Sequence, residues 1–294
     1  MKRSLIWGLA ALVLGLSGCL KNDLEEEKLA ENEREIQAYI TKNNLPVQKT
    51  ASGLYYAITQ PSGSSRLPAK GELVTFHFTL RRLLDDVIID SSRVARNRPI
   101  KLIFGVQGNT EALREGIGLF HTGDRGLVLA PSNLAYGAAG GPGLLPFSTL
   151  RYDFNILNIQ NEDEQIEAYI RENNIRVDER TDTGLRLTYL QRAAAGADTV
   201  KATSSPTIRY NTKLLDETQI DPNPRTGNLF TTSSFDLSKV VKGFQEALLK
   251  LRVGDRVRAI MPSTIGYGTT GNSDGRVPPY SPLVFDIEVI SIPK

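Results

Sequence analysis

The chain has 294 residues, enough for two domains, and its charges nearly cancel, with 35 Lys and Arg against 33 Asp and Glu. This balance gives no basic excess for binding nucleic acid, and an aromatic content of 7% is modest. Two histidines and a single cysteine form no zinc-site spacing and no disulfide, so we expect no metal, no cofactor and no redox chemistry.

The N-terminus has the order of a bacterial lipoprotein signal. A basic start, Met1-Lys2-Arg3, precedes an apolar stretch over residues 5–16 that is too short to span a bilayer. The next residues, Leu16-Ser17-Gly18-Cys19, resemble the lipobox. The resemblance implies that residues 1–18 are a signal peptide and that Cys19 is lipidated and anchors the protein in a membrane. A short signal-anchor helix and a simple secretory signal are the alternatives.

Residues 19–32 are expected to be a charged tether, with a helix beginning near Glu33. Lys21-Asn22-Asp23 could be a surface-export signal, although a charged spacer is the simpler interpretation. Leu20, which stands directly after Cys19, favours the outer over the inner membrane by the sorting rule of proteobacterial lipoproteins. We therefore expect a lipid-anchored protein of the cell envelope.

Beyond the tether the chain repeats itself. The run Ile36–Leu45 returns about 130 residues later as Ile166–Ile175, an offset that suits whole domains rather than solenoid repeats. The echo continues in Ser52-Gly53-Leu54 and Thr183-Gly184-Leu185, Ile89-Asp90 and Ile220-Asp221, and Tyr136-Gly137 and Tyr267-Gly268. The sequence thus predicts a tandem duplication, with one domain over residues 33–160 and a second over residues 161–294.

Each repeat predicts the same order of elements. A helix with apolar residues at i, i+3 and i+4 opens it, and half-buried strands with alternating apolar residues follow near residues 54–58 and 74–78, and near 185–189 and 208–210. A middle helix over residues 113–120 or 244–251 ends at a Gly-Asp pair, Gly123-Asp124 or Gly254-Asp255. Strands follow at 125–129 and 150–156, and at 256–261 and 283–290. This order predicts an α+β fold, an antiparallel sheet around one short helix.

The second repeat resembles the FKBP family of peptidyl-prolyl isomerases along its whole length. The motifs that carry the resemblance, in chain order, are Tyr210, Ile220-Asp221, Phe235, Val240-Val241-x-Gly243-Phe244, Gly254-Asp255, Gly266-Tyr267-Gly268, Val277-Pro278-Pro279 and Leu283-Val284-Phe285-Asp286. The first repeat is similar. The resemblance implies two FKBP-like domains that need no metal and form no covalent intermediate.

The resemblance also implies an aromatic pocket that accepts proline-containing polypeptides. In the second domain the implied catalytic residues are Asp221, Tyr267, Phe244 as the floor, and Val241, whose backbone N–H would hold a substrate carbonyl. The implied substrate-binding residues are Tyr210, Ile220, Phe235, Val240, Val277 and Phe285. Each aromatic residue taken alone could simply belong to the core.

The first domain departs from this pattern. Its counterpart positions are Phe78, Ile89, Asp90, Ile100, Leu113, Tyr136, Leu144, Leu145 and Tyr152. The rim reads Asn109-Thr110 where the second domain has two valines, Leu113 replaces the floor ring, and Phe78 lacks a hydroxyl. We expect a shallower, degenerate pocket there and more activity in the second domain.

The leading hypothesis is a prolyl isomerase that assists the folding of exported envelope proteins. The alternative is a peptide-binding chaperone or assembly module on the same scaffold, without rate enhancement. A purely structural envelope lipoprotein with relic domains is a third possibility. The sequence does not indicate the oligomeric state or the client proteins.

Overall fold

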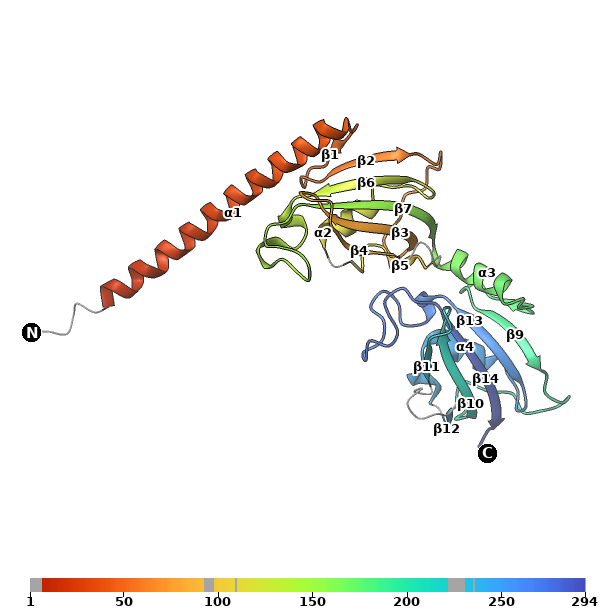
Figure 1. Cartoon of the computed structure of the whole chain (residues 1–294). Coiled ribbons are helices and arrows are strands. Elements are labelled where there is room, and N and C mark those ends of the chain that lie inside the picture. The colour runs from red at the N-terminus through yellow and green to blue at the C-terminus, as the bar shows by residue number, and fades with distance from the viewer. Residues whose placement is uncertain (1–6, 93–97, 109, 222–230, 235, 294) are drawn as a thin grey trace, which may run out of the picture. The chain divides into compact units, whose positions relative to one another are not determined.

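The computed structural model describes residues 7–92, 98–108, 110–221, 231–234 and 236–293, with residues 7–22 and 231–234 described by their backbone only. The chain forms two compact units, divided between Ile159 and Gln160. The first unit holds residues 1–69 and 74–159, and residues 160–294 form the body of the second. Each unit is an antiparallel sheet with helices, coloured red to green in the first unit and green to blue in the second (Figure 1).

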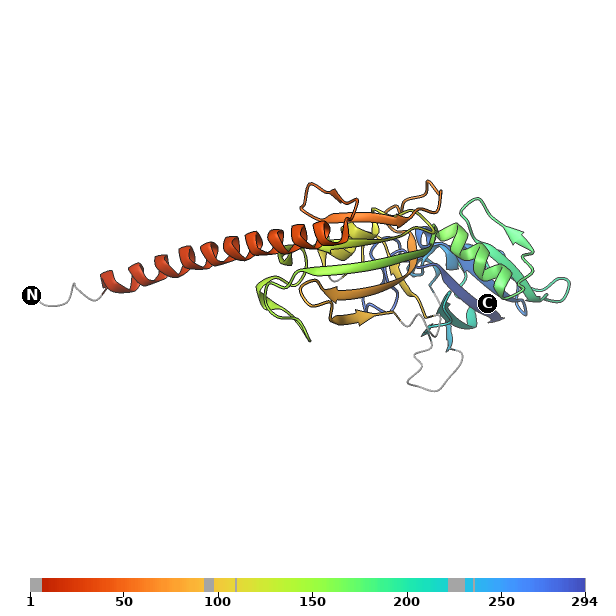
Figure 2. The same cartoon turned by 45° about the horizontal axis from the view of Figure 1, so that its top comes forward.

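Over the described residues, the first unit has a seven-stranded sheet in the order β1-β2-β6-β7-β3-β4, with β5 paired to β3. Its elements are α1 Trp7–Asn43, β1 Gln48–Lys49, β2 Tyr55–Gln60, β3 Leu73–Arg82, β4 Ile88–Ser91, β5 Ile100–Ile103, α2 Glu111–Ile117, β6 Arg125–Ala130, the short 3₁₀ helices η2 Ser132–Leu134 and η3 Gly137–Ala139, and β7 Leu150–Gln160. The long strands β7 and β3 run side by side in the middle of the sheet (Figures 1 and 2).

The second unit repeats this topology. Its described strands follow the order β11-β10-β14-β13-β9-β8, with β12 paired to β10. Read from β8, this is the order of the first sheet with each strand replaced by its counterpart. Its elements are α3 Glu162–Glu172, β8 Glu179–Arg180, β9 Arg186–Gln191, β10 Thr207–Leu214, β11 Gln219–Asp221, β12 Thr231–Ser234, η5 Leu237–Lys239, α4 Lys242–Leu249, β13 Arg256–Met261, η6 Ser263–Ile265 and β14 Leu283–Ser291. The duplication and the α+β fold are confirmed.

The opening helix of the first unit is longer than predicted. Helix α1 begins at Trp7, so the expected tether over residues 19–32 is helical, and the prediction of a helix start near Glu33 was wrong. Residues 23–35 contain strong helix formers such as Glu, Lys, Leu and Ala and no Gly or Pro, which explains the helix without an apolar stripe. None of the helices in the described part of the chain is long and apolar enough to cross a membrane.

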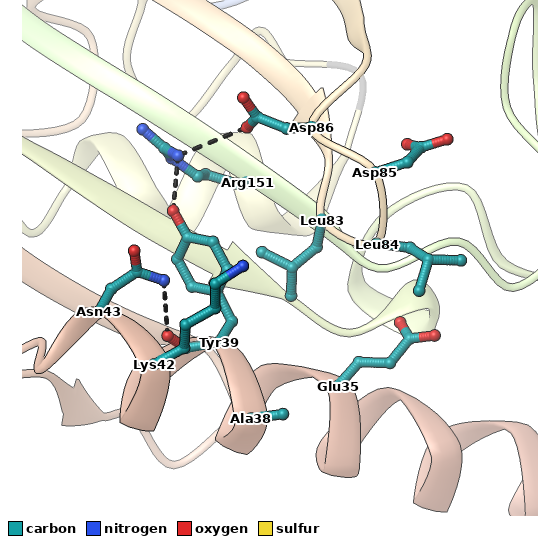
Figure 3. Close-up of a pocket in the computed structure, with 10 residues that line it drawn as sticks. All are labelled: Glu35, Ala38, Tyr39, Lys42, Asn43, Leu83, Leu84, Asp85, Asp86 and Arg151. Atoms are coloured by element: carbon teal, nitrogen blue, oxygen red, sulfur yellow. Dashed lines mark hydrogen bonds and ion pairs between the residues drawn. The ribbon is translucent and has the colours of Figure 1, made fainter.

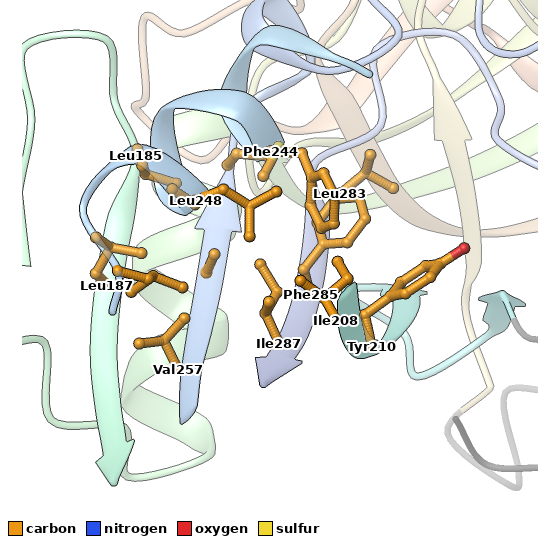
Figure 4. Packing of buried hydrophobic residues seen from close by; sticks show 14 of the residues in the cluster. Leu185, Leu187, Ile208, Tyr210, Phe244, Leu248, Val257, Leu283, Phe285 and Ile287 are labelled. Carbon is orange, nitrogen blue, oxygen red and sulfur yellow. The ribbon is translucent and has the colours of Figure 1, made fainter. Parts of the chain in front are cut away.

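Both faces of each sheet are covered. In the first unit α2 packs on the inner face, while Ile36 of α1 is buried on the outer face with Tyr55, Ala57, Leu127 and Leu129. In the second unit α4 packs on the inner face, where Leu248 meets Leu187, Val257 and Leu283 (Figure 4). Ile166 and Tyr169 of α3 pack outside on Ile260 and Val284. Strands β2, β6, β13 and β14 are therefore buried on both sides beneath the opening helices. Strand β10 alternates, with Ile208 and Tyr210 buried and Arg209 exposed, as the sequence predicted.

The Gly-Asp pair after each middle helix forms a buried turn. Gly123 and Gly254 have φ of 88° and 97°, a left-handed conformation that favours glycine. The buried carboxylate of Asp124 accepts hydrogen bonds from the backbone N–H groups of Ser62 at 2.7 Å and His121 at 2.9 Å. Burial alone would raise the pKa of Asp124, but these N–H donors outweigh it and hold the pKa below its ordinary value.

We expect Asp124→Asn to lower the unfolding free energy of the first unit by about 1–3 kcal/mol at pH 7, because the amide lacks the charge and one acceptor. Since the folded pKa of Asp124 is the lower one, its contribution is complete above the unfolded value of about 3.9 and is lost as the pH falls through the folded pKa. The difference in unfolding free energy between the wild type and the variant should therefore shrink below about pH 4.

Hydrogen exchange of β6 peptides, read by mass spectrometry and corrected for intrinsic rates, measures this difference. Peptides from β13 in the same sample are the internal control. Two results would contradict this role of Asp124. One is equal protection of the β6 amides in the variant and the wild type at pH 7, and the other is a difference in protection that stays constant down to pH 3.

Candidate functional site

Three aromatic rings meet at one end of the inner core of the second unit. Phe244 of α4 lies between Tyr210 of β10 and Phe285 of β14, with ring centroids 5.8 Å and 4.8 Å apart. The three side chains are buried, and the hydroxyl of Tyr210 points away from the leucine-rich core (Figure 4). Tilted and edge-to-face rings of this kind form a rigid apolar wall. The structure thus brings together the predicted floor and two of its predicted walls.

A polar pair stands at the edge of this aromatic cluster. The hydroxyl of Tyr210 donates a hydrogen bond to the carboxylate of Asp221, which ends β11. Burial, followed by this contact with a negative charge, raises the pKa of Tyr210 and keeps the phenol protonated. Ile220, the neighbour of Asp221, is buried in the same core. The carboxylate is therefore held in one orientation beside the rings.

The rim of the cluster presents a backbone donor. Val241 is the N-cap residue of α4, and no side chain caps this helix start. Among the described residues, no group accepts a hydrogen bond from the Val241 N–H. Val240 and Val241 are partly buried and pack against the core, so this donor stands next to apolar surface. A free N–H at a helix N-terminus is suited to bind a carbonyl oxygen.

The loop between β13 and β14 supplies the remaining predicted residues. Val277 is buried in the inner core, whereas the Tyr267 side chain is 36% exposed. Burial, then the nearby negative charges of Asp221 and Asp274, raise the pKa of Tyr267. The phenol of Tyr267 therefore lies in the field of the Asp221 carboxylate and is protonated at neutral pH.

Sequence reasoning missed Arg276 in this loop. Its guanidinium donates to the backbone carbonyl of Ile220 and to the Asp274 carboxylate, and so ties the loop to β11 beside Asp221. The only signal in the sequence was a charged residue directly before Val277. Of the other predicted positions, Phe235 lies outside the described residues.

The first unit fills the same region differently. Tyr152 takes the place of Phe285, and its hydroxyl shares a hydrogen bond of 3.1 Å with Thr110 Oγ1, which stands where Val241 stands in the second unit. Burial raises the pKa of Tyr152 to about 12. Thr110 also caps α2 by accepting from the Leu113 N–H. A buried polar pair thus replaces the apolar rim. Asn109, the other predicted rim residue, lies outside the described residues.

The remaining first-unit positions are only partly assembled. Phe78, Ile89, Leu113, Tyr136 and Leu144 pack in or against the inner core. Asp90 of β4 is exposed and accepts from the Ser91 N–H at 2.7 Å, since Phe78 offers it no hydroxyl. Ile100 and Leu145 are 39% and 64% exposed and take no part in that core. The first unit therefore has the apolar frame of the pocket without its oriented carboxylate.

The two histidines have structural partners in the first unit. His77 is buried and shares a hydrogen bond of 2.8 Å with Ser92 Oγ, and His121 contacts the Asp124 carboxylate at 2.9 Å. Among the described residues, no group of three or more His, Cys, Asp or Glu side chains could hold a metal ion.

A groove of about 590 Å³ lies between α1 and the turn after β3 in the first unit, and no residue of the aromatic region of that unit lines it (Figure 3). Four of its lining residues contact one another. Arg151 donates to the Tyr39 hydroxyl at 2.5 Å and lies 3.6 Å from Asp86, and Asn43 donates to the Tyr39 carbonyl. The contact of Arg151 with Tyr39 joins β7 to α1 on the outer face of the sheet.

Comparison with known proteins matches both units to one family. The family model for FKBP-type peptidyl-prolyl cis-trans isomerases matches residues 64–157 and 196–290, more than half of the chain. The peptidyl-prolyl cis-trans isomerase FKBP9 of Homo sapiens is 27% identical over 234 residues, 79% of this chain and 37% of that protein. The macrophage infectivity potentiator of Trypanosoma cruzi is 42% identical over 85 residues, 29% of this chain and 41% of that protein.

The chain therefore spans about two fifths of the length of these relatives. Among solved structures, FkpA from Escherichia coli shares 24% identity over 54% of this chain and 74% of that one, with a TM-score of 0.39. The two matched segments show that the chain belongs to the FKBP family of peptidyl-prolyl cis-trans isomerases and carries the family's domain twice.

Proposed function

We propose that the second unit is a peptidyl-prolyl cis-trans isomerase that acts on proline-containing segments of exported proteins in the cell envelope. The observation that carries this proposal is the cluster of Tyr210, Phe244 and Phe285 with, on its rim, the backbone N–H of Val241, which has no acceptor in the described part of the chain. An apolar cup and a single carbonyl-binding donor suit a peptide bond that must twist. The reaction needs no nucleophile.

The chemistry follows from the resonance of the imide. Rotation about an X-Pro bond must cross a barrier of about 18–20 kcal/mol, because twisting removes the partial double bond. The planar imide is charge-separated and is stabilised by water, whereas the twisted imide is less polar. A dry aromatic cup therefore favours the twisted state over the planar one and lowers the barrier.

Three groups would orient the substrate. The N–H of Val241 binds the carbonyl of a residue next to the proline and holds that side of the bond still. The Asp221 carboxylate, fixed by the Tyr210 hydroxyl, and the Tyr267 hydroxyl lie on the polar side of the rings, where the imide oxygen would sweep as it rotates. No step requires a metal or a cofactor.

The first unit fits a binding or spacing role better than catalysis. Leu113 stands in place of the floor ring, and Thr110 and Tyr152 form a polar pair in place of the apolar rim. These features favour a second candidate function for that unit, the holding of apolar or proline-containing segments without rate enhancement. The chain as a whole would then combine a client-holding domain with an isomerase domain.

The location rests on the N-terminal sequence. Lipid on Cys19 would hold the protein at a membrane of the cell envelope, and Leu20 favours the outer membrane. Clients would be exported polypeptides that fold after translocation.

Replacing the floor ring tests where catalysis occurs. We expect Phe244→Leu, which gives the second unit the floor residue of the first, to lower kcat/KM for a short X-Pro peptide by about tenfold or more, because the ring contacts to Tyr210 and Phe285 are lost. Exchange spectroscopy by NMR on the full chain measures the rate. Leu113→Ala in the first unit is the matched control and should leave the rate unchanged. Full activity of Phe244→Leu would place catalysis elsewhere.

The role of the Val241 N–H can be tested by a variant that lacks this hydrogen. Val241 has φ of −60°, the value that proline adopts, and Val240 has the extended conformation that a following proline requires. We expect Val241→Pro to keep the fold and to lower kcat/KM by about five- to tenfold, the loss of one hydrogen bond. Val241→Ala keeps the N–H, and its kcat/KM should fall less than that of Val241→Pro. Equal losses in the two variants would show that only the side chain matters.

Lipidation has its own test. Mass spectrometry of the N-terminal peptide from membranes of the producing bacterium should show a chain that starts at Cys19 and carries acyl chains. Cys19→Ala should lack that mass, whereas Lys21→Ala should retain it. An unmodified Cys19 in the wild type would contradict the proposed anchor.

A further inference from the structure

The helix that opens the second unit also touches its pocket loop. The carboxylate of Glu162, the first residue of α3, accepts hydrogen bonds from both the backbone N–H and the hydroxyl of Ser263, each at 2.6 Å. Ser263 is 3% exposed and begins η6, the turn that leads into Tyr267. A carboxylate that receives two such donors forms strong, charge-assisted hydrogen bonds.

Ser263 in turn holds both neighbours of Tyr267. Its carbonyl oxygen accepts from the Gly266 N–H and the Gly268 N–H, each at 2.8 Å, and the Gly268 carbonyl accepts from the Tyr280 N–H at 3.0 Å. The backbone on either side of Tyr267 is therefore fixed to one buried serine. A connected set of hydrogen bonds runs from Glu162 through Ser263 to the loop that presents the phenol.

The first unit has a related but different contact. Asn32 of α1 is buried, accepts from the Ser132 N–H at 2.8 Å and donates to the Phe147 carbonyl at 2.9 Å. The hydroxyl of Ser132 is buried without a hydrogen-bond partner among the described residues. The opening helix thus binds the pocket loop in both units. Only Glu162 accepts from both the backbone N–H and the hydroxyl of the serine.

We propose that Glu162 is a positioning residue that sets the conformation of the Tyr267 loop, and thereby the activity of the second unit. The effect of Glu162 on activity rests on the proposed function, whereas its effect on the conformation of the loop does not. Glu162 stands only two residues after Gln160, where the second unit begins, so the helix turn that joins the units also holds the pocket loop.

Asp163 provides a matched control on the same helix turn. It carries the same charge next to Glu162, so its loss has the same effect on the helix dipole. Its carboxylate pairs with Arg186, which keeps Glu167 as a second partner, and it does not contact Ser263. Comparing Glu162→Ala with Asp163→Ala therefore isolates the contact with Ser263.

The experiment measures amide hydrogen exchange at Gly266 and Gly268 by NMR in the full chain, together with kcat/KM on an X-Pro peptide. We expect Glu162→Ala to speed exchange at both glycines by about tenfold or more over Asp163→Ala and to lower kcat/KM severalfold. Glu162→Gln keeps an acceptor for the Ser263 N–H. It should restore much of the slow exchange at the two glycines and much of kcat/KM.

Exchange rates in Glu162→Ala that equal those in Asp163→Ala would overturn the proposal. Faster exchange with unchanged kcat/KM would overturn the link to activity. If the wild type accelerates no isomerisation, the proposed function fails, and the exchange rates at Gly266 and Gly268 still decide whether Glu162 positions the loop.

Discussion

A helix packed on each face of the sheet is the constraint on which the rest of each unit depends. A middle helix covers the inner face, and the opening helix covers the outer face with Ile36 in one unit and Ile166 in the other. Two-sided burial makes the sheet a stiff support. The aromatic cluster stands at one end of the inner face, and the outer helix of the second unit holds the pocket loop just beyond the end of β13 through Glu162. Fold and site therefore share the same helices.

The two units share the same sheet and covering helices but differ in the pocket. Strand order and the buried Gly-Asp turn are the same in both units. The differences lie at a few side chains around the rings, where an oriented carboxylate and an apolar rim in one unit become an exposed Asp90 and a Thr110–Tyr152 pair in the other. These changes leave the core intact, so the first unit keeps its fold, and under the proposed function it keeps a binding role without catalysis.

Local patterns predicted most of the fold. The strand over residues 256–261 was placed at its observed bounds, because alternating apolar residues stand between a Gly-Asp turn and a proline. The start of α1 was missed, since a charged helix without an apolar stripe has no such pattern. The resemblance brought Tyr210, Phe244 and Phe285 together correctly. The contact of Glu162 with Ser263 joins residues 101 positions apart, and no local signal marks it.

The most direct test of the account is to locate the peptide. Titration of the ¹⁵N-labelled full chain with a short X-Pro peptide should shift the amide of Val241 strongly, because its free N–H gains a carbonyl acceptor, and should shift the amides of Phe244 and Tyr267 as well. The amides of Thr110 and Leu113 should move much less. The strongest shifts around Thr110, or no shift at Val241 at a saturating peptide concentration, would contradict the claim that the second unit holds the functional pocket.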